Sequence, residues 1–391
     1  MVFLKVRQIK KSATLFITLG LLIGSAILIF SYNFIFDSRL SVKNLDIDLQ
    51  YNASNSYVFI KNQTQDIGNR IPGTPESKEC VQFFISEFKK IDNDYSYFYH
   101  NFSVYETNCT NVLFKMNEDK KQIVILGAHY DSRARATKDI SSNRDIPVPG
   151  ANDGASGCAV LLELARILYP QRENLTCQIW FLFFDAEDQG YDYGYGIPDW
   201  DWCEGSERFV NELENFYYPN NETIECMLLF DMVGGTGLQF INEQYSTSSL
   251  LDELFAVGRA LGFTYVFPIN PEVNSIIDDH KAFVDSEIPS ADLIINFWNN
   301  PCWPYHHTIN DTLQHISNES LEITGKTVEQ FIYNNYLDVP WNLYKGNYPW
   351  NIDQTRLSTQ IITQILILIG IISIAVAGYL IYIGLKSSHR N

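Results

Sequence analysis

The sequence predicts an α/β protein in which helices sandwich a mostly parallel, mixed sheet, with one transmembrane helix at each end of the chain. Short apolar runs that suit buried strands alternate with segments of helical periodicity, a pattern typical of a parallel sheet covered on both faces. A long apolar run lies near each end of the 391 residues. A histidine or an acidic residue follows several of the strand-like runs, which predicts a polar site at the carboxyl edge of the sheet.

The two terminal runs, residues 14–36 and 361–385, are each long enough to cross a bilayer as a helix. Basic residues without acids flank each run on the side of the nearer chain terminus. Because such flanks stay in the cytoplasm, we expect both termini there and residues 37–356 outside, at the plasma membrane or an equivalent membrane. A cleaved signal peptide is the alternative for the first run, and a buried core helix is the alternative for the second.

A single large domain is expected between these runs, because this segment has no internal repeat and no linker rich in Pro, Gly and Ser. The predicted parts are a cytoplasmic tip and anchor at 1–36, a stalk at 37–56, the domain at 57–337, a second stalk at 338–360, a transmembrane helix at 361–385 and a cytoplasmic tail at 386–391. Inside the domain, helical patterns occupy residues 80–91, 155–168 and 250–261, and strand-like runs occupy residues 123–128, 179–184, 227–230 and 293–297.

Acidic residues dominate the middle segment. It holds all 46 Asp and Glu and 22 of the 28 Lys and Arg, since six lie in the flanks, which gives a formal charge near −24. This bias argues against nucleic acid as a partner. The same segment carries eight Asn-x-Ser/Thr sequons and all seven cysteines, which is consistent with glycosylation and an oxidising compartment. We expect Cys203 and Cys302, each beside a tryptophan, to form a disulfide.

Candidate metal ligands follow the strand-like runs or lie in loops beside them. In chain order they are His129, Asp131, Asp153, Glu187, Asp188, Asp231 and His307. Neutral histidine combined with several carboxylates suits zinc with an open position for water. Each residue alone has a structural alternative: Asp153 would serve equally as a helix cap, and a lone histidine more often packs or hydrogen-bonds. Their placement in one architecture predicts a metal site.

Seven motifs, in order over about residues 60–335, resemble those of the zinc aminopeptidase and glutaminyl cyclase family. They are Arg70-Ile-Pro-Gly-Thr74, Gly127-Ala-His-Tyr-Asp-Ser132, Gly150-Ala-Asn-Asp-Gly-Ala-Ser-Gly157, Phe184-Asp-Ala-Glu-Asp188, Asp231-Met-Val-Gly-Gly235, Asp278-Asp-His280 and His307-Thr-Ile-Asn-Asp311. The resemblance implies a phosphorylase/hydrolase-like zinc exopeptidase fold and a zinc-dependent catalytic domain at residues 57–337. It also implies the amino-terminal ends of peptides or proteins as substrates.

The resemblance assigns the metal ligands residue by residue. Asp153, Asp188 and His307 match the primary zinc ligands. His129 and Asp231 match the ligands of a second metal, with Asp153 bridging, in members that hold two. A single zinc is expected for a cyclase and two for an aminopeptidase.

The same resemblance assigns two further carboxylates, and a third is expected to act beside them. Asp131 matches the carboxylate that orients the ring of His129. Glu187 matches the general acid/base, and Asp279 is expected to act with it on the substrate amine.

The chain departs from the family in three places that bear on the substrate pocket. The zinc carboxylate after the catalytic Glu is usually Glu, but here it is Asp188, as in bacterial-type relatives. The aromatic insertion at residues 189–204 is either a pocket wall or a self-packed surface loop. Cyclases commonly carry Trp at the position of His306. The expected pocket residues are Trp200, Trp202, Trp303 and His306.

Three functions remain open from the sequence. In a glutaminyl-peptide cyclotransferase, the α-amine attacks the side-chain amide of an N-terminal glutamine and ammonia leaves. In an aminopeptidase, two zincs activate a water instead. A receptor-like ectodomain on the same scaffold is the third alternative. The motifs at 278–280, 202–206 and 231–235 most resemble bacterial-type cyclotransferases, so a cyclase is favoured.

Overall fold

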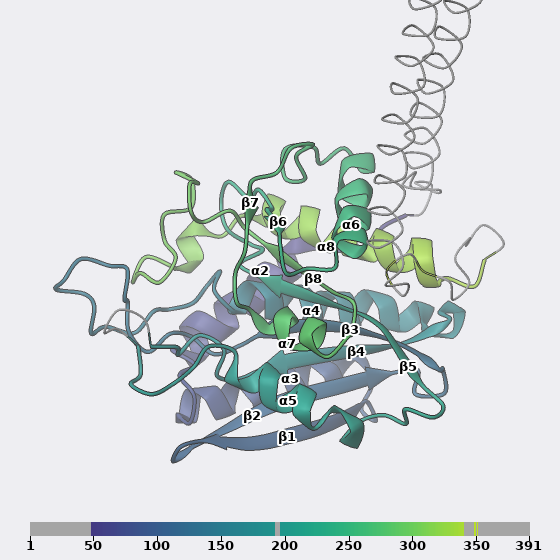
Figure 1. Ribbon diagram of the computed structural model, residues 1–391, viewed down its shortest axis with the longest axis horizontal. Coiled ribbons are helices and arrows are strands. Elements are labelled where there is room, and N and C mark those ends of the chain that lie inside the picture. The colour runs from purple at the N-terminus through teal and green to yellow at the C-terminus, as the bar shows by residue number, and fades with distance from the viewer. Residues whose placement is uncertain (1–47, 192–195, 340–347, 349, 351–391) are drawn as a thin grey trace, which may run out of the picture. The chain divides into compact units, whose positions relative to one another are not determined.

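A sheet whose central strands are almost entirely buried forms the core of the computed structural model (Figure 1), which describes residues 48–191 and 196–339 together with Tyr348 and Trp350. The strands of the sheet are β1 (Ser96–Val104), β2 (Thr107–Met116), β3 (Gln122–His129), β4 (Cys177–Phe184), β5 (Thr223–Asp231) and β8 (Ser290–Ile294). Their order is β1-β2-β4-β3-β5-β8. Strands β4, β3, β5 and β8 are parallel to one another, whereas β2 is antiparallel to both of its neighbours, β1 and β4. The mixed, mostly parallel sheet agrees with the prediction.

Both faces of the sheet are buried, as the central strand β4 illustrates. All eight of its residues are buried. Phe181 and Phe183 enter one core cluster, whereas Trp180 and Leu182 enter another. This alternation follows from the two-residue period of a strand and requires helices on both sides.

Helices supply the cover on each face. They are α2 (Ala53–Lys61), α3 (Pro75–Ile91), α4 (Ala155–Leu168), α5 (Glu204–Asn211), α6 (Ser248–Ala260), α7 (Asp279–Asp285) and α8 (Asn318–Tyr336), with the short turns η1 (Asn62–Ile67), η2 (Tyr169–Asn174), η3 (Leu213–Asn215) and η4 (Leu313–His315). α5 and α7 add Phe209 and Phe283 to the cluster that contains Trp180, while α2, α3, α4, α6 and α8 pack into the other cluster (Figure 1). A small parallel pair, β6 (Asn242–Glu243) and β7 (Val273–Asn274), lies outside the main sheet.

The predicted elements correspond to β3, β4, β5, β8, α3, α4 and α6, with shifts at their ends. α3 begins at Pro75 because the Thr74 side chain accepts a hydrogen bond from the Ser77 amide and Pro75 suits the first turn. The prediction began this helix at residue 80. β8 ends at Ile294, whereas the predicted run continues to Phe297, which lies in the loop beyond the strand.

Two segments expected as stalks contribute buried residues. Tyr51 is buried, and the Glu329 carboxylate accepts hydrogen bonds from the amides of Gln50 and Tyr51. Near the other end, Tyr348 is buried and its hydroxyl donates to the Asn335 carbonyl at 2.9 Å. Residues within 37–56 and 338–360 are therefore part of the folded domain, which corrects the boundaries predicted for it.

The prediction of a transmembrane helix at each end is not supported by the part of the chain that the structure describes. In residues 48–339, outside the gap at 192–195, no helix has both the length and the apolar character to span a membrane. The two apolar runs at 14–36 and 361–385 lie outside the described residues.

The predicted disulfide between Cys203 and Cys302 is also wrong. All seven cysteines are described, and none is bonded to another. Cys203 is buried with its sulfur 3.5 Å from Glu187 Oε1, whereas Cys302 is exposed. The two side chains therefore lie in different surroundings, although each follows or precedes a tryptophan in the chain.

The buried guanidinium of Arg70 connects the segment before α3 to the loops above the sheet. Arg70 donates from Nε to the Tyr130 carbonyl at 2.8 Å and from Nη2 to the Gly150 carbonyl at 2.7 Å. Its Nη1 donates to the carbonyls of Gly68 and Pro149 at 3.0 and 3.1 Å. One side chain therefore donates to four carbonyl oxygens, of which that of Gly150 also accepts from the Ala155 amide at 3.3 Å.

Replacing Arg70 by Met should lower the free energy of unfolding by about 3 kcal/mol or more, because several buried carbonyls lose their donor at once. Urea denaturation of the purified chain measures this change. The control is Lys90→Met, which removes an exposed cation from the surface of α3 and should change stability by less than about 0.5 kcal/mol. Equal stability of the two variants would contradict the role given to Arg70.

Candidate active site

The carboxyl ends of β3, β4 and β5 deliver polar side chains to one edge of the sheet. His129 ends β3 and Asp231 ends β5, while Glu187 and Asp188 follow β4. Asp153 lies in the turn before α4. Gly154 in that turn has φ of +90°, and a Cβ there would lie 2.7 Å from the His129 carbonyl oxygen, so only glycine lets the turn approach β3 this closely.

Asp153 lies between two groups of candidate ligands. On one side, His307 Nε2 is 3.6 Å from Asp153 Oδ2 and 2.9 Å from Asp188 Oδ1. On the other side, His129 Nε2 is 3.2 Å from Asp153 Oδ1 and 3.1 Å from Asp231 Oδ1. The two carboxylate oxygens of Asp153 therefore face different groups, as a bridging ligand would.

The donor set fits a zinc ion. Asp153 Oδ2 and Asp188 Oδ2 are buried and have no hydrogen-bond partner among the described residues. Buried carboxylate oxygens without partners are costly unless a cation binds them. Burial lowers the pKa of His307 well below its usual value, and nearby Arg133 adds to this, so the ring stays neutral and keeps a lone pair for a metal.

Asp131 holds several parts of the site in place. Its carboxylate accepts hydrogen bonds from the amides of Glu187 and Asp188, both at 3.1 Å, and from Gln189 Nε2 at 2.8 Å. Its Oδ1 also lies 3.4 Å from His129 Nδ1. One carboxylate thus orients the His129 ring and the backbone that carries Glu187 and Asp188.

The pKa values of His129 and Glu187 are both raised, for different reasons. Burial alone lowers the pKa of His129, but the carboxylates of Asp131, Asp153 and Asp231 outweigh it and raise that pKa well above its usual value. Burial raises the pKa of Glu187 well above its usual value; His129 opposes this shift, and neighbouring carboxylates add to it.

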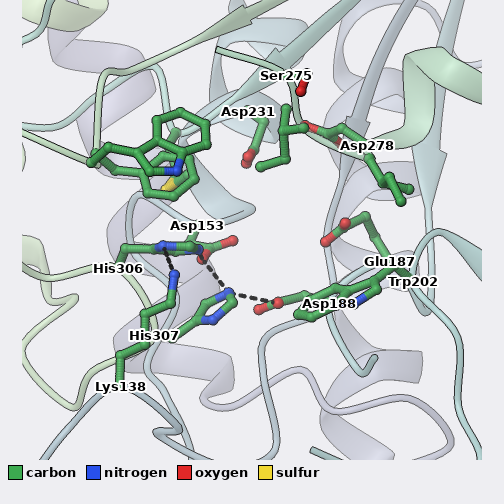
Figure 2. A pocket seen from close by; sticks show the side chains of 15 residues that line it. Lys138, Asp153, Glu187, Asp188, Trp202, Asp231, Ser275, Asp278, His306 and His307 are labelled. Carbon is green, nitrogen blue, oxygen red and sulfur yellow. Dashed lines mark hydrogen bonds and ion pairs between the residues drawn. The ribbon is translucent and has the colours of Figure 1, made fainter. Parts of the chain in front are cut away.

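A cavity of about 310 Å³ opens above these residues (Figure 2). Its lining comprises Lys138, Asp153, Glu187, Asp188, Trp202, Asp231, Met232, Ser275, Ile276, Ile277, Asp278, Phe297, Trp298, His306 and His307. Carboxylates and imidazoles form one part, and aromatic and aliphatic side chains form another. Such a small, partly apolar cavity with convergent polar groups suits a small-molecule or peptide-end ligand.

Residues 111–332 match the model of peptidase family M28. The chain belongs to this family. It is 24% identical to a glutaminyl-peptide cyclotransferase of Dictyostelium discoideum over 64% of this chain and 75% of the relative. Two solved structures each match with a TM-score of 0.65 and 30% identity, over 73% of this chain and 99% of theirs: a zinc-dependent exopeptidase of Parabacteroides distasonis and a glutaminyl cyclase of Bacteroides thetaiotaomicron.

Membership of M28 makes the protein an enzyme of a zinc-dependent family whose members are exopeptidases or glutaminyl cyclases. Peptide amino-terminal ends are the substrates consistent with that family. The mixed sheet with helices on both faces is also the fold of the family.

Three residues expected in the M28 substrate site lie elsewhere. Trp200 packs in a separate small cluster with Ala186, and Trp303 is buried against Gly235, so neither lines the cavity. Asp279 begins α7, is buried and does not line the cavity, whereas its neighbour Asp278 does. Adjacent residues point in different directions at a helix start, and the sequence did not indicate which one faces inward. Trp202 and His306 line the cavity as predicted.

Arg133 was missed, although it lies within the stretch that follows His129. Its buried guanidinium donates from Nη1 to the Asp188 carbonyl at 2.6 Å and lies 3.3 Å from Asp188 Oδ1. Trp202 stacks over this guanidinium at 4.6 Å and is nearly parallel to the His307 ring. Because the predicted site contains many acidic residues, the basic Arg133 could have been recognised in the sequence as a partner for one of them.

Missed cavity residues also include Lys138, Phe297 and Trp298, which lie in loops without a distinctive pattern. Their position depends on long-range contacts. The amide of Lys138, for example, donates to the His307 carbonyl at 3.2 Å.

Zinc affinity should depend on pH in a direction that follows from Asp188. Burial raises the pKa of Asp188 to about 6 in the metal-free protein, although Arg133 opposes the shift. Above this pH the carboxylate is charged and open to zinc, and below it a proton competes. Affinity should therefore fall by up to about tenfold per pH unit below pH 6.

Chelator competition at pH 7.5, 6 and 5, corrected for protonation of the chelator, measures this dependence. Asp145→Asn, which removes an exposed carboxylate paired with Arg135, is the control and should follow the same curve as the wild type. An affinity that stays constant from pH 7.5 to 5 would exclude proton competition at Asp188.

Proposed function

We propose that this protein is a glutaminyl-peptide cyclotransferase, which converts an N-terminal glutamine to pyroglutamate with loss of ammonia. One observation carries the choice. Burial opposes the shift, but the carboxylates of Asp131, Asp153 and Asp231 raise the pKa of His129 well above its usual value, which favours a protonated ring without a free lone pair, whereas burial lowers the pKa of His307 well below its usual value and keeps that ring neutral. This difference favours one metal, held by Asp153, Asp188 and His307, and a single zinc is the expectation for a cyclase.

The zinc would supply Lewis acidity that polarises the side-chain amide carbonyl of the glutamine. The protein's own residues bind and move protons around that group. Glu187 and Asp278 line the cavity and present carboxylates to a substrate ammonium group. Trp202, Phe297 and Ile276 provide an apolar wall for the methylene groups of the glutamine side chain.

Glu187 is the proposed proton carrier. The α-amine nitrogen forms a bond to the amide carbon, and the bond from that carbon to the amide nitrogen breaks. Glu187 takes a proton from the attacking amine and delivers it to the departing nitrogen, so that ammonia leaves and the carboxylate is regenerated. Burial raises the pKa of Glu187 well above its usual value, which suits a group that alternates between the two protonation states.

A zinc aminopeptidase is the second candidate. It is supported by the position of Asp153, whose two oxygens face His307 and His129 respectively, as a bridge between two metals would. The similarity to the exopeptidase of Parabacteroides distasonis supports it too. A receptor-like role has less support, because every ligand position of the family motif is filled by a residue able to bind metal.

The reaction itself separates these candidates. The purified chain should be incubated with zinc and two peptides that differ only in their first residue, Gln or Leu, and followed by mass spectrometry. The Gln peptide should lose about 17 Da, the mass of the ammonia released in the proposed reaction, while the Leu peptide stays intact. Stepwise shortening of the Leu peptide would instead establish the aminopeptidase.

Glu187 and Asp188 are neighbours with different proposed roles, so matched variants test both. Glu187→Gln should retain zinc and lose activity by roughly 10²- to 10⁴-fold, the usual contribution of a positioned acid/base. Asp188→Ala should lose zinc. Metal analysis beside turnover distinguishes the two, and loss of zinc from Glu187→Gln would show that the roles are reversed.

A further inference from the structure

His306 occupies a fixed position beside the proposed metal ligands. Its ring lies between Phe297, with centroids 4.1 Å apart, and His307, with centroids 3.7 Å apart. The Nε2 atom of His306 is 3.9 Å from Asp153 Oδ2, the same oxygen that lies 3.6 Å from His307 Nε2. His306 therefore directs Nε2 toward the edge of the metal centre.

The other ring nitrogen of His306 faces Lys138. Figure 2 shows the lysine beside the ring, and its Nζ lies 2.7 Å from His306 Nδ1. An ammonium group has donors and no acceptor, so Nδ1 must accept this hydrogen bond through its lone pair. In a neutral ring with Nδ1 unprotonated, the hydrogen is on Nε2.

This tautomer decides between two roles for His306. By position, Asp153, His306 and His307 are close enough to hold a metal together. A nitrogen that carries a hydrogen has no lone pair for a metal, however, so Nε2 of His306 acts as a donor. Lys138 thus gives the two adjacent histidines different roles: His307 is a metal ligand, and His306 is a hydrogen-bond donor.

The backbone fixes Lys138 for this task. Its amide donates to the His307 carbonyl at 3.2 Å, and the next residue, Asp139, accepts from the Ile309 amide at 3.0 Å through Oδ2. The lysine Nζ also lies 5.2 Å from the centre of the Phe297 ring. The loop that carries Lys138 is therefore attached to the segment that carries both histidines.

We propose that Lys138 holds His306 in its Nε2–H form, and that His306 donates a hydrogen bond to the carbonyl oxygen of the reacting amide. This inference rests on the proposed function, since negative charge develops on that oxygen as the amine attacks. Five cavity side chains are carboxylates, which cannot donate to it when ionised: Asp153, Glu187, Asp188, Asp231 and Asp278. A donor beside the metal would stabilise the charge in the transition state.

The tautomer and the metal can be tested without any reaction. In the full chain labelled with ¹⁵N-histidine, the His306 signals, assigned by their absence in His306→Gln, should show an unprotonated Nδ1 and a protonated Nε2. Lys138→Met should abolish this preference. Zinc content should persist in His306→Gln and be lost in His307→Gln; loss of zinc from both would make His306 a ligand and overturn the proposal.

Kinetics tests the donor. With a Gln peptide, His306→Ala should lower kcat roughly 10²-fold, the usual effect of removing one such donor, and leave KM within about threefold. Lys138→Met should lower kcat by less, and the double variant should be no slower than His306→Ala, because Lys138 acts through His306. Multiplied effects in the double variant would refute that positioning role.

Arg135→Met is the matched control, since Arg135 is a cation of the same loop paired with the exposed Asp145, and its kcat should equal the wild type. If the wild type cleaves the Leu peptide and leaves the Gln peptide unchanged, the proposed cyclase fails, and the same variants are measured on cleavage. That reaction also builds negative charge on an amide oxygen, so an unchanged kcat in His306→Ala would reject the donor in either reaction.

Discussion

The burial of many carboxylates at one edge of the sheet is the constraint on which the site depends. A charged group removed from water must find a counter-charge or several hydrogen-bond donors. Two solutions are visible. Asp131 and Asp311 are satisfied by backbone amides, Asp311 by those of Asn152 and Asp153 at 2.8 and 3.0 Å. Asp153 and Asp188 each keep an oxygen without a partner among the described residues, which is the opening that a metal requires.

Asp131 and Asp311 also link the loops that carry the candidate ligands. Asp131 joins the end of β3 to the segment after β4, and Asp311 joins the turn before α4 to the segment after His307. Lys138 adds a third connection, through its amide to the His307 carbonyl. Asp153, Asp188 and His307 come from distant parts of the chain, and the backbone of each is hydrogen-bonded to one of these three linking residues. Such mutual support gives a metal site its rigidity.

Much of this site was predictable because polar residues directly after apolar runs must meet at the carboxyl edge of a parallel sheet. That argument places His129, Asp188 and Asp231 correctly in space. It does not predict the direction of a side chain, so Asp279 was expected in the site, although it is Asp278 that faces the cavity. Nor does it separate an aromatic residue that fills the core, such as Trp303, from one that lines a cavity. The hairpin β1–β2 escaped prediction because β1 is only partly buried and its polarity follows no clear period.

The different exposure of the seven cysteines gives this protein a natural site for chemical labelling. Six thiols are buried, and Cys302 alone of the seven is exposed. A bulky thiol-reactive dye should therefore attach selectively to the loop that leads to His307, without any engineered residue. Fluorescence from that position would follow the loop beside the cavity as peptides enter and leave it.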